Sequence, residues 1–355
     1  MSGRAILALD TSCYTTSCAL VGAAGEAIVD LRLPLPVPPG QRGLRQAEAV
    51  FAHLIRLPGL VGQAMDVART RGWEVVGVAA STRPRPPRDS YLPVFRVGEG
   101  FGRALAASLG VPFGDASHQE GHLAAGWHAG LPDTLLAVHV SGGTTELLRL
   151  QGGCPWEVVS LGTSLDLHAG QFLDRVGVAL GLPFPAGPAL DRLAGGQAED
   201  AVTAGAPPGA DPRDADGETG AQQVAIPVTV RGYRPSFAGP EAAAMRLIER
   251  GTAPPLVARA ALLCVARALE KMVLAAIQAG EPRVVLVVGG VAASSLVRER
   301  LRHRLAHPAV GMELHFPPPE LCTDNAVGVG RWAWQRAQAP VHGDDLKGLG
   351  GASVE

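Results

Sequence analysis

Two stretches of similar pattern decide the fold: AILALDTSCYTTSCALVGAAGE at residues 5–26 and TLLAVHVSGGTTELLRLQGG at residues 134–153. Each reads as an apolar strand, a turn of small polar residues, a second strand and a glycine-rich turn, which is the pattern of a β-hairpin. In both copies the backbone N–H groups and hydroxyls between the two strands can point at an anion. Because the pattern recurs, we expect a duplicated phosphate-binding fold.

The rest of the chain alternates between strand-like and helix-like segments. Residues 73–82 predict a buried strand, and residues 98–110, 165–181 and 256–278 predict helices. Residues 283–294, RVVLVVGGVAAS, predict a buried strand that ends in a glycine pair and opens a helix, a geometry that lets a nucleotide approach the backbone. This alternation favours an α/β fold with parallel strands covered by helices.

Length and composition bound the organisation of the chain. Its 355 residues suit two lobes, which we expect at 1–130 and 131–340, followed by a flexible tail at 341–355. Residues 197–223 lack an apolar period and are rich in Ala, Gly, Pro and Asp, so we expect a mobile surface loop there. All five cysteines are scattered without a C-x-x-C pair, which indicates reduced thiols.

The composition also restricts the partners. No apolar run reaches the roughly 18 residues of a membrane span, and the N-terminus lacks the features of a signal peptide, so we expect a cytoplasmic protein without a membrane partner. Only two of the 31 Lys and Arg residues are lysine, and the formal net charge is −2. A protein that grips nucleic acid alone usually carries a basic excess, so any RNA partner needs a local basic patch or a helper subunit.

One short segment, SHQEGHLAAG at residues 117–126, places two histidines four residues apart. On a helix these positions share one face, so His118 and His122 can offer their imidazoles to one metal ion, and a carboxylate from elsewhere can complete an open site. A structural or surface role for the pair is the alternative. The order H-Q-E-G-H lacks the H-E-x-x-H arrangement that places Glu120 on metal-bound water, which argues against a peptidase.

Four further motifs carry a resemblance to a known family. They are VSGGTTEL at 140–147, AGQFLDRVGVALGLPFPAGPALDRLA at 169–194, VVGGVAAS at 287–294 and CTDN at 322–325. Together, and in this order, they resemble the TsaD family of tRNA threonylcarbamoyltransferases, which make the t6A modification. The resemblance implies the duplicated actin/hexokinase/Hsp70-like ATPase (ASKHA) fold, with two lobes and the nucleotide site in the cleft between them.

The resemblance also implies a metal and a nucleotide site. It adds Asp324 to His118 and His122 as the third ligand of one divalent metal, iron by resemblance, while the donor set also suits zinc or manganese. It implies an adenylate or ATP-type ligand, with a phosphate turn, two ribose-side aspartates, a close-approach glycine and an adenine-loop serine. The predicted nucleotide residues are Val140, Ser141, Gly142, Gly143, Thr144, Asp174, Gly187, Asp191 and Ser294.

The implied reaction is acyl transfer. Threonylcarbamoyl-AMP would deliver its carbonyl carbon to the exocyclic amine of an adenosine in the tRNA anticodon loop, and an unpaired loop base can be splayed out and reached. A metal would polarise the carbamoyl or phosphoryl oxygen. We expect tRNA to bind weakly to the chain alone and to need accessory subunits similar to TsaB and TsaE, in a hetero-oligomer.

Several positions depart from the family pattern. Acidic residues usually follow the first Ser-Cys, where this chain has Tyr14 and Thr15, so Asp10 and Ser12 remain as candidate catalytic residues. Thr144 replaces the usual histidine after SGG, and Ser294 replaces an asparagine in the adenine loop.

Two further departures change the charge of the chain. Glu241 replaces the lysine of an F-S-G-L-K motif, so a basic contact to RNA or phosphate is missing at that position. Arg83, Arg85 and Arg88 lie in a proline-rich loop at 81–95, where they either bind phosphate or carboxylate or simply face solvent.

Two rival functions stay open at this point. One is a carbamoyltransferase that uses a related adenylate but a different acceptor. The other is a paralogue that has lost catalysis and serves as a nucleotide-dependent scaffold, which the altered motifs at 11–17 and 140–145 favour.

Overall fold

The computed structural model describes residues 3–38, 40–203 and 224–338. Its first five-stranded sheet has the order β3-β2-β1-β4-β5, formed by β1 (Gly3–Asp10), β2 (Thr15–Gly22), β3 (Ala27–Pro34), β4 (Trp73–Arg83) and β5 (Phe113–Ser117). The first three strands are antiparallel, and β4 and β5 continue the sheet in parallel with β1. The predicted hairpin at 5–26 is therefore the β1–β2 pair.

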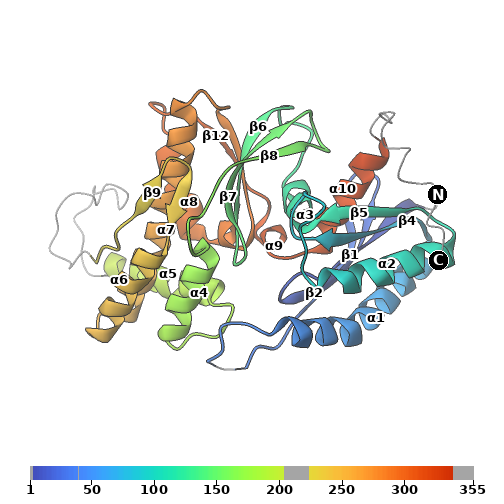
Figure 1. The fold of residues 1–355 in the computed structure, drawn as a ribbon, viewed down its shortest axis with the longest axis horizontal. Coiled ribbons are helices and arrows are strands. Elements are labelled where there is room, and N and C mark those ends of the chain that lie inside the picture. Colours follow the sequence, from blue (N-terminus) through green and yellow to red (C-terminus); the bar gives the residue numbers. More distant parts are fainter. Residues whose placement is uncertain (1–2, 39, 204–223, 339–355) are drawn as a thin grey trace.

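The second sheet repeats this arrangement. It has the order β12-β11-β6-β7-β8, formed by β6 (Leu135–Val140), β7 (Thr145–Gln151), β8 (Glu157–Thr163), β11 (Val284–Val288) and β12 (Glu313–His315). Again three antiparallel strands precede two strands that run parallel to the first. The duplicated α/β fold with two lobes is thus confirmed (Figure 1).

Helices cover the outer faces of both sheets. In the first lobe α1 (Gln46–Arg71) and α2 (Phe95–Leu109) pack on the first sheet and bury a core that includes Leu7, Leu20 and Leu57. In the second lobe the outer helices share one larger core. These are α4 (Ala169–Ala179), α5 (Gly187–Thr203), α6 (Ala238–Glu249), α7 (Pro254–Gln278) and α8 (Ser295–Leu305), with the small β9–β10 ribbon (Thr229–Arg231 and Arg234–Ser236) beside them.

Two details differ from the sequence prediction. Helix α5 continues to Thr203, so the loop expected at 197–223 does not begin at its predicted start, and residues 204–223 lie outside the described residues. The segment after β11 first forms a 3-10 turn, η1 (Gly290–Ala293), before α8 begins at Ser295. The expected tail at 341–355 also lies outside the described residues.

The layer between the two sheets contains α3 (His118–Ala125) and α10 (Ala326–Gln338). Side chains of these helices share one core with strand residues of both sheets, among them Ala8 of β1 and Leu286 of β11. The last helix, red in Figure 1, therefore returns to the first lobe, and Trp334 Nε1 donates a hydrogen bond to the carbonyl of Val21 (2.8 Å). A lobe boundary at residue 130 remains a prediction.

Glycines permit the close packing of α10. A Cβ atom on Gly330 would lie 2.5 Å from Cγ2 of Val21, and one on Gly328 would overlap the carbonyl oxygen of Gly121 in α3. The backbones of α3 and α10 therefore approach one another more closely than any side chain would allow.

We predict that Gly328→Ala lowers the free energy of unfolding by about 1–3 kcal/mol, the usual cost of overpacking a core, because the two helices must separate. Gly62→Ala is the matched control, since Gly62 lies in α1 and a Cβ atom added there would meet nothing within 4 Å. This control should stabilise the protein by about 0.5–1 kcal/mol. Chemical denaturation measures both changes, and equal stability of the two variants would contradict the packing argument.

Candidate functional site

Local sequence explains why α3 begins where it does. The Ser117 hydroxyl accepts a hydrogen bond from the Glu120 N–H (3.1 Å), and the Glu120 carboxylate accepts one from the Ser117 N–H (2.5 Å), which is a capping box. Glu120 is thus occupied at the helix start, and Gly121 faces α10. Glu120 and Gly121, two of the three residues between the histidines, therefore fix the position of the helix that carries the pair.

The predicted metal ligands come together at the junction of the lobes. His118 Nε2 lies 3.1 Å from His122 Nε2, and Asp324 Oδ1 lies 3.4 Å and 3.6 Å from these two nitrogens. The point equidistant from the three atoms is about 2 Å from each, which is the distance at which zinc and similar ions bind nitrogen and oxygen ligands. We call His118, His122 and Asp324 the metal trio. Among the described residues, they form the group of three His, Cys, Asp or Glu side chains that lie close enough together to hold a metal ion.

Asp10 orients the first ligand. Its carboxylate, at the end of β1, is fully buried and lies 3.3 Å from Nδ1 of His118. The same carboxylate accepts hydrogen bonds from the hydroxyls of Ser12 (2.8 Å) and Ser81. When Nδ1 of His118 donates to Asp10, its Nε2 lone pair is free to face the metal position, as in many carboxylate–histidine–metal sites.

The electrostatics of the trio favour a bound cation. Burial alone would lower the pKa of His118, but the carboxylates of Asp10 and Asp324 raise it to about 10. Burial and the neighbouring His118 lower the pKa of His122. Burial would raise the pKa of Asp324, but its hydrogen bonds to both histidines hold that pKa well below the usual range. The site thus pairs the buried carboxylate of Asp10 and the partly exposed carboxylate of Asp324 with two imidazoles, and a cation suits this charge balance.

A second layer of polar residues behind His122 is not evident from the sequence pattern. The ring of His139, in β6, lies 4.9 Å from the ring of His122. The Gln119 amide contacts Nδ1 of His139 (3.2 Å) and donates to the Glu146 carboxylate (2.7 Å), and Arg85 approaches Glu146 from the other lobe (3.3 Å). Burial lowers the pKa of His139 well below its ordinary value, so this ring stays neutral beside the ligands.

The predicted phosphate turn lies between β6 and β7. The Ser141 N–H donates to the Thr144 carbonyl (2.7 Å), which closes the turn and leaves Gly142 and Gly143 exposed. Helix α4 begins against this turn, because a Cβ on Gly170 would lie only 2.5 Å from the Gly142 nitrogen. Sequence reasoning missed Gly170, although it brings a positive helix N-terminus to the turn, a geometry that suits phosphate.

Asp174 and Gly187 lie beside this turn. A Cβ on Gly142 would be 4.0 Å from Oδ2 of Asp174, whose Oδ1 accepts a hydrogen bond from the Ala186 N–H (2.7 Å). The space around Gly187 is open, since nothing lies within 4 Å of a Cβ placed there. Burial raises the pKa of Asp174 to about 6, although hydrogen bonds from the Ala186 and Gly187 amides lower it in part.

Asp191, in α5, and Ser294, just before α8, contact one another. The Asp191 carboxylate accepts hydrogen bonds from the Ser294 hydroxyl and from the N–H (3.0 Å) and hydroxyl (2.9 Å) of Ser295. Ser294 also caps α8 through the Val297 N–H (3.3 Å). Both residues therefore have structural partners, and their nucleotide role stays a prediction.

Tyr14, one of the departures from the family pattern, joins the two lobes. Its ring makes an edge contact with Phe184 of the α4–α5 connection, with centroids 4.9 Å apart. Burial raises the pKa of the Tyr14 phenol, and the charges of Cys13, Asp174 and Asp324 raise it further. The phenol therefore feels the charges both of Asp324 in the metal trio and of Asp174 among the predicted nucleotide residues.

The charged residues that depart from the family pattern form ion pairs within the protein. Arg83 pairs with Asp115 (2.6 Å), while Arg85 pairs with the buried Glu146 as described above. Glu241, in the place of a lysine, pairs with Arg175 (2.9 Å). Two of the three loop arginines thus have carboxylate partners within the protein.

The geometry predicts that the His118→Ala/His122→Ala double variant loses its bound metal, because two of the three converging donors disappear. The matched control is His128→Ala/His315→Ala, a histidine pair whose ring nitrogens also lie 3.1 Å apart but which lies outside the metal trio. Metal content per chain, measured by mass spectrometry, should fall only in the first variant. Equal metal content in both variants would exclude this site.

Asp174 generates a pH prediction. Because its folded pKa of about 6 exceeds the ordinary value of 3.8, ionisation destabilises the fold, and this penalty develops between about pH 4 and pH 6. Asp174→Asn keeps an oxygen acceptor but cannot ionise, so it should exceed the wild type in stability at pH 7 by up to about 3 kcal/mol and match it near pH 4. Denaturation curves across this range measure the difference, and parallel pH profiles would refute it.

Comparison with known proteins shows the family of this chain. The sequence profile of the family TsaD, tRNA N6-adenosine threonylcarbamoyltransferase, matches residues 41–330. Relatives with that name include one from Thermus thermophilus, which is 33% identical over 94% of this chain and 93% of its own length. Another, from Prochlorococcus marinus, is 34% identical over 97% of this chain and 93% of its own length.

Solved structures show the same fold at low sequence identity. HypF of T. kodakarensis aligns over 95% of this chain and 48% of its own, with a TM-score of 0.57 and 15% identity. An activator of 2-hydroxyisocaproyl-CoA dehydratase from Clostridium difficile, solved with bound ADPNP, aligns over 99% of this chain and 100% of its own, with a TM-score of 0.51 and 15% identity. The extent of the sequence matches decides the family: this chain belongs to TsaD, the tRNA N6-adenosine threonylcarbamoyltransferases.

Proposed function

We propose that this protein transfers a threonylcarbamoyl group from threonylcarbamoyl-AMP to the exocyclic amine of an adenosine in the tRNA anticodon loop. The observation that carries the proposal is the convergence of His118, His122 and Asp324 at metal-binding distance in a chain of this family. The C–O bond between the carbamoyl carbon and the phosphate breaks, the bond to the adenosine nitrogen forms, AMP leaves with the electron pair, and the amine proton passes to the departing phosphate or to water.

The metal centre would hold the reacting group. His118, His122 and Asp324 would bind one divalent ion, which supplies a Lewis acid for the carbamoyl or phosphoryl oxygen. The chain's own contribution is to fix these donors, since Asp10 holds the His118 ring and the capping box holds the helix. We propose iron as this ion by analogy with the family, although the donor set also suits zinc and manganese.

The adenylate would lie beside the turn at Ser141–Gly143. The α4 N-terminus and the backbone N–H groups of this turn favour its phosphate, and the open space at Gly187 leaves room for the nucleoside. Tyr14, in place of the acidic residues of other members, contacts Phe184 and feels the charges of Asp174 and Asp324. Asp10 and Ser12 are buried, and the Ser12 hydroxyl donates a hydrogen bond to the Asp10 carboxylate. This supports a positioning role for both residues rather than a role as general base.

The partners follow from the substrate. We propose a cytoplasmic complex with tRNA and accessory subunits similar to TsaB and TsaE. Of the described residues, no helix has the length and apolar character required to span a bilayer.

The transfer reaction tests the proposal directly. Protein, threonylcarbamoyl-AMP and unmodified tRNA, with and without accessory subunits, should yield the modified nucleoside, detected by mass. Asp324→Ala should reduce the yield at least 100-fold, because the metal loses a ligand, whereas Glu320→Ala, which removes an exposed carboxylate four residues earlier, should retain it.

Absence of product from a protein that still binds metal and AMP would contradict the proposal. Carbamoylation of a small molecule from carbamoyl-AMP would then identify a different acceptor, and no transfer to any acceptor would identify a scaffold.

A further inference from the structure

The surface around α8 carries a concentration of positive charge that the proposed chemistry does not use. The helix, SLVRERLRHRL, turns Val297, Leu301 and Leu305 to the core and carries its basic residues on the remaining faces. The chain as a whole has a formal net charge of −2, so this local excess stands out against an acidic background.

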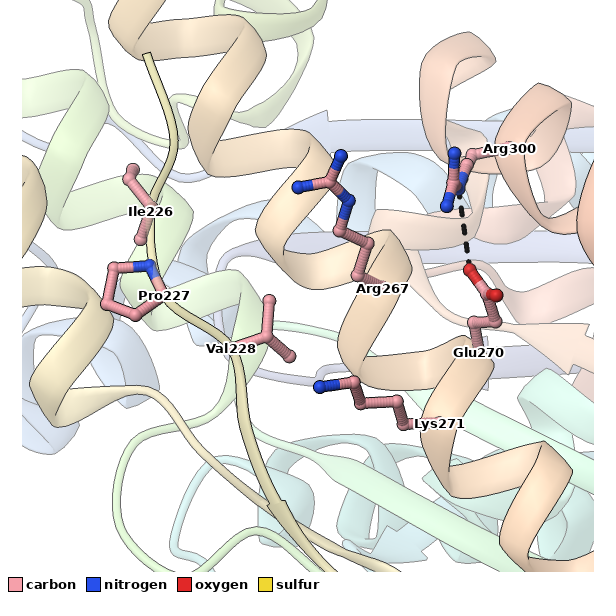
Figure 2. Close-up of a pocket in the computed structure, with 7 residues that line it drawn as sticks. All are labelled: Ile226, Pro227, Val228, Arg267, Glu270, Lys271 and Arg300. Atoms are coloured by element: carbon pink, nitrogen blue, oxygen red, sulfur yellow. Dashed lines mark hydrogen bonds and ion pairs between the residues drawn. The ribbon is translucent and has the colours of Figure 1, made fainter. Parts of the chain in front are cut away.

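One side of α8 borders a hollow of about 370 Å³ (Figure 2). Arg267 and Lys271, four residues apart on α7, face the extended segment at 226–228 across this hollow, and Arg300 of α8 closes its end. Within residues 3–38, 40–203 and 224–338, neither Arg267 nor Lys271 has an ion pair. Two cations without a carboxylate partner in a concave surface are suited to an external anion.

The remaining charge at this hollow is held in place. Glu270 is buried and pairs with Arg300 (3.4 Å) and Arg304 (2.9 Å), so one carboxylate fixes two guanidinium groups and neutralises only one of them. The hollow therefore keeps a net positive charge with ordered donors.

A second hollow lies on the other side of α8, with a volume of about 630 Å³. Arg302 and His303 line it together with Pro319, the first residue of α9 (Pro319–Cys322). The guanidinium of Arg302 lies over the Phe316 ring, 4.9 Å from its centroid, which holds it at the surface. Asp324 follows α9 after one residue, so this hollow borders the segment that leads along the chain to the metal trio.

We infer that the basic face of α7 and α8 binds the phosphate backbone of tRNA, while an anticodon-loop base reaches the metal centre. This basic face comprises Arg267, Lys271, Arg300, Arg302, His303 and Arg304. The inference deepens the proposed function and rests on it for the identity of the RNA. Helix α8 is about 16 Å long, and duplex RNA or DNA of similar length presents several phosphates per strand, so more than one contact can form at once.

The test reverses two exposed charges on this face, one beside each hollow, in Lys271→Glu/Arg302→Glu. Arg4→Glu/Arg71→Glu is the matched control, because it makes the same charge change at exposed positions near the start of β1 and the end of α1. Binding of unmodified tRNA to the full chain is measured by fluorescence anisotropy at several salt concentrations. The face variant should weaken binding at least tenfold and lower the salt slope by about 2, one for each lost phosphate contact, and the control should change neither.

Three further readouts separate this inference from its alternatives. Metal content and AMP binding should be unchanged in the face variant, which shows that it is folded. Transfer at saturating tRNA should proceed at the wild-type rate with a raised KM for tRNA. Binding of tRNA by the face variant with the wild-type affinity would overturn the inference. Inorganic phosphate that binds to this face and that tRNA does not displace would overturn it as well. A wild type that binds tRNA through this face but forms no product would instead refute the proposed function alone.

Discussion

The contact between Gly121 and Gly328 is the constraint on which the site depends. These residues let α3 and α10 approach until their backbones touch, and that approach sets Asp324, just before α10, beside the histidines of α3. A side chain at Gly328 would overlap the Gly121 carbonyl and move Asp324 away from the two histidines. The metal geometry is therefore a consequence of helix packing, with the capping box and Asp10 as its local supports.

The two lobes contribute differently to the chemistry. The metal trio lies in the core layer between the sheets, where close packing holds donors within narrow limits. The predicted nucleotide residues lie on turns and helix starts of the second lobe, where glycines leave open space. Tyr14 and Arg85 also join the lobes, through an aromatic contact and an ion pair, beside the core that both sheets share with α3 and α10.

Much of this arrangement could be predicted from the sequence. The repeated hairpin pattern indicated the duplicated sheets, because strand periodicity is local information. Helical spacing indicated the His118–His122 pair, but Asp324 came from family resemblance, since nothing local links residues 200 positions apart. The contact of Asp10 with His118, the chain from Arg85 to His139 and the pairing of Tyr14 with Phe184 could not be predicted, because each joins segments that only the tertiary fold brings together. The start of the 197–223 loop was wrong because α5 continues to Thr203 despite its Gly- and Ala-rich composition.

The return of the last helix to the first sheet sets the order in which the protein can mature. A nascent chain on the ribosome displays β1–β5 and both histidines long before residues 324–338 are synthesised, and N-terminal segments generally fold first. Until α10 arrives, α3 alone covers part of the inner face of the first sheet, and the histidines lack Asp324. Loading of the metal is thereby postponed until residues 324–338 have been synthesised, so a chain without them cannot carry a finished centre.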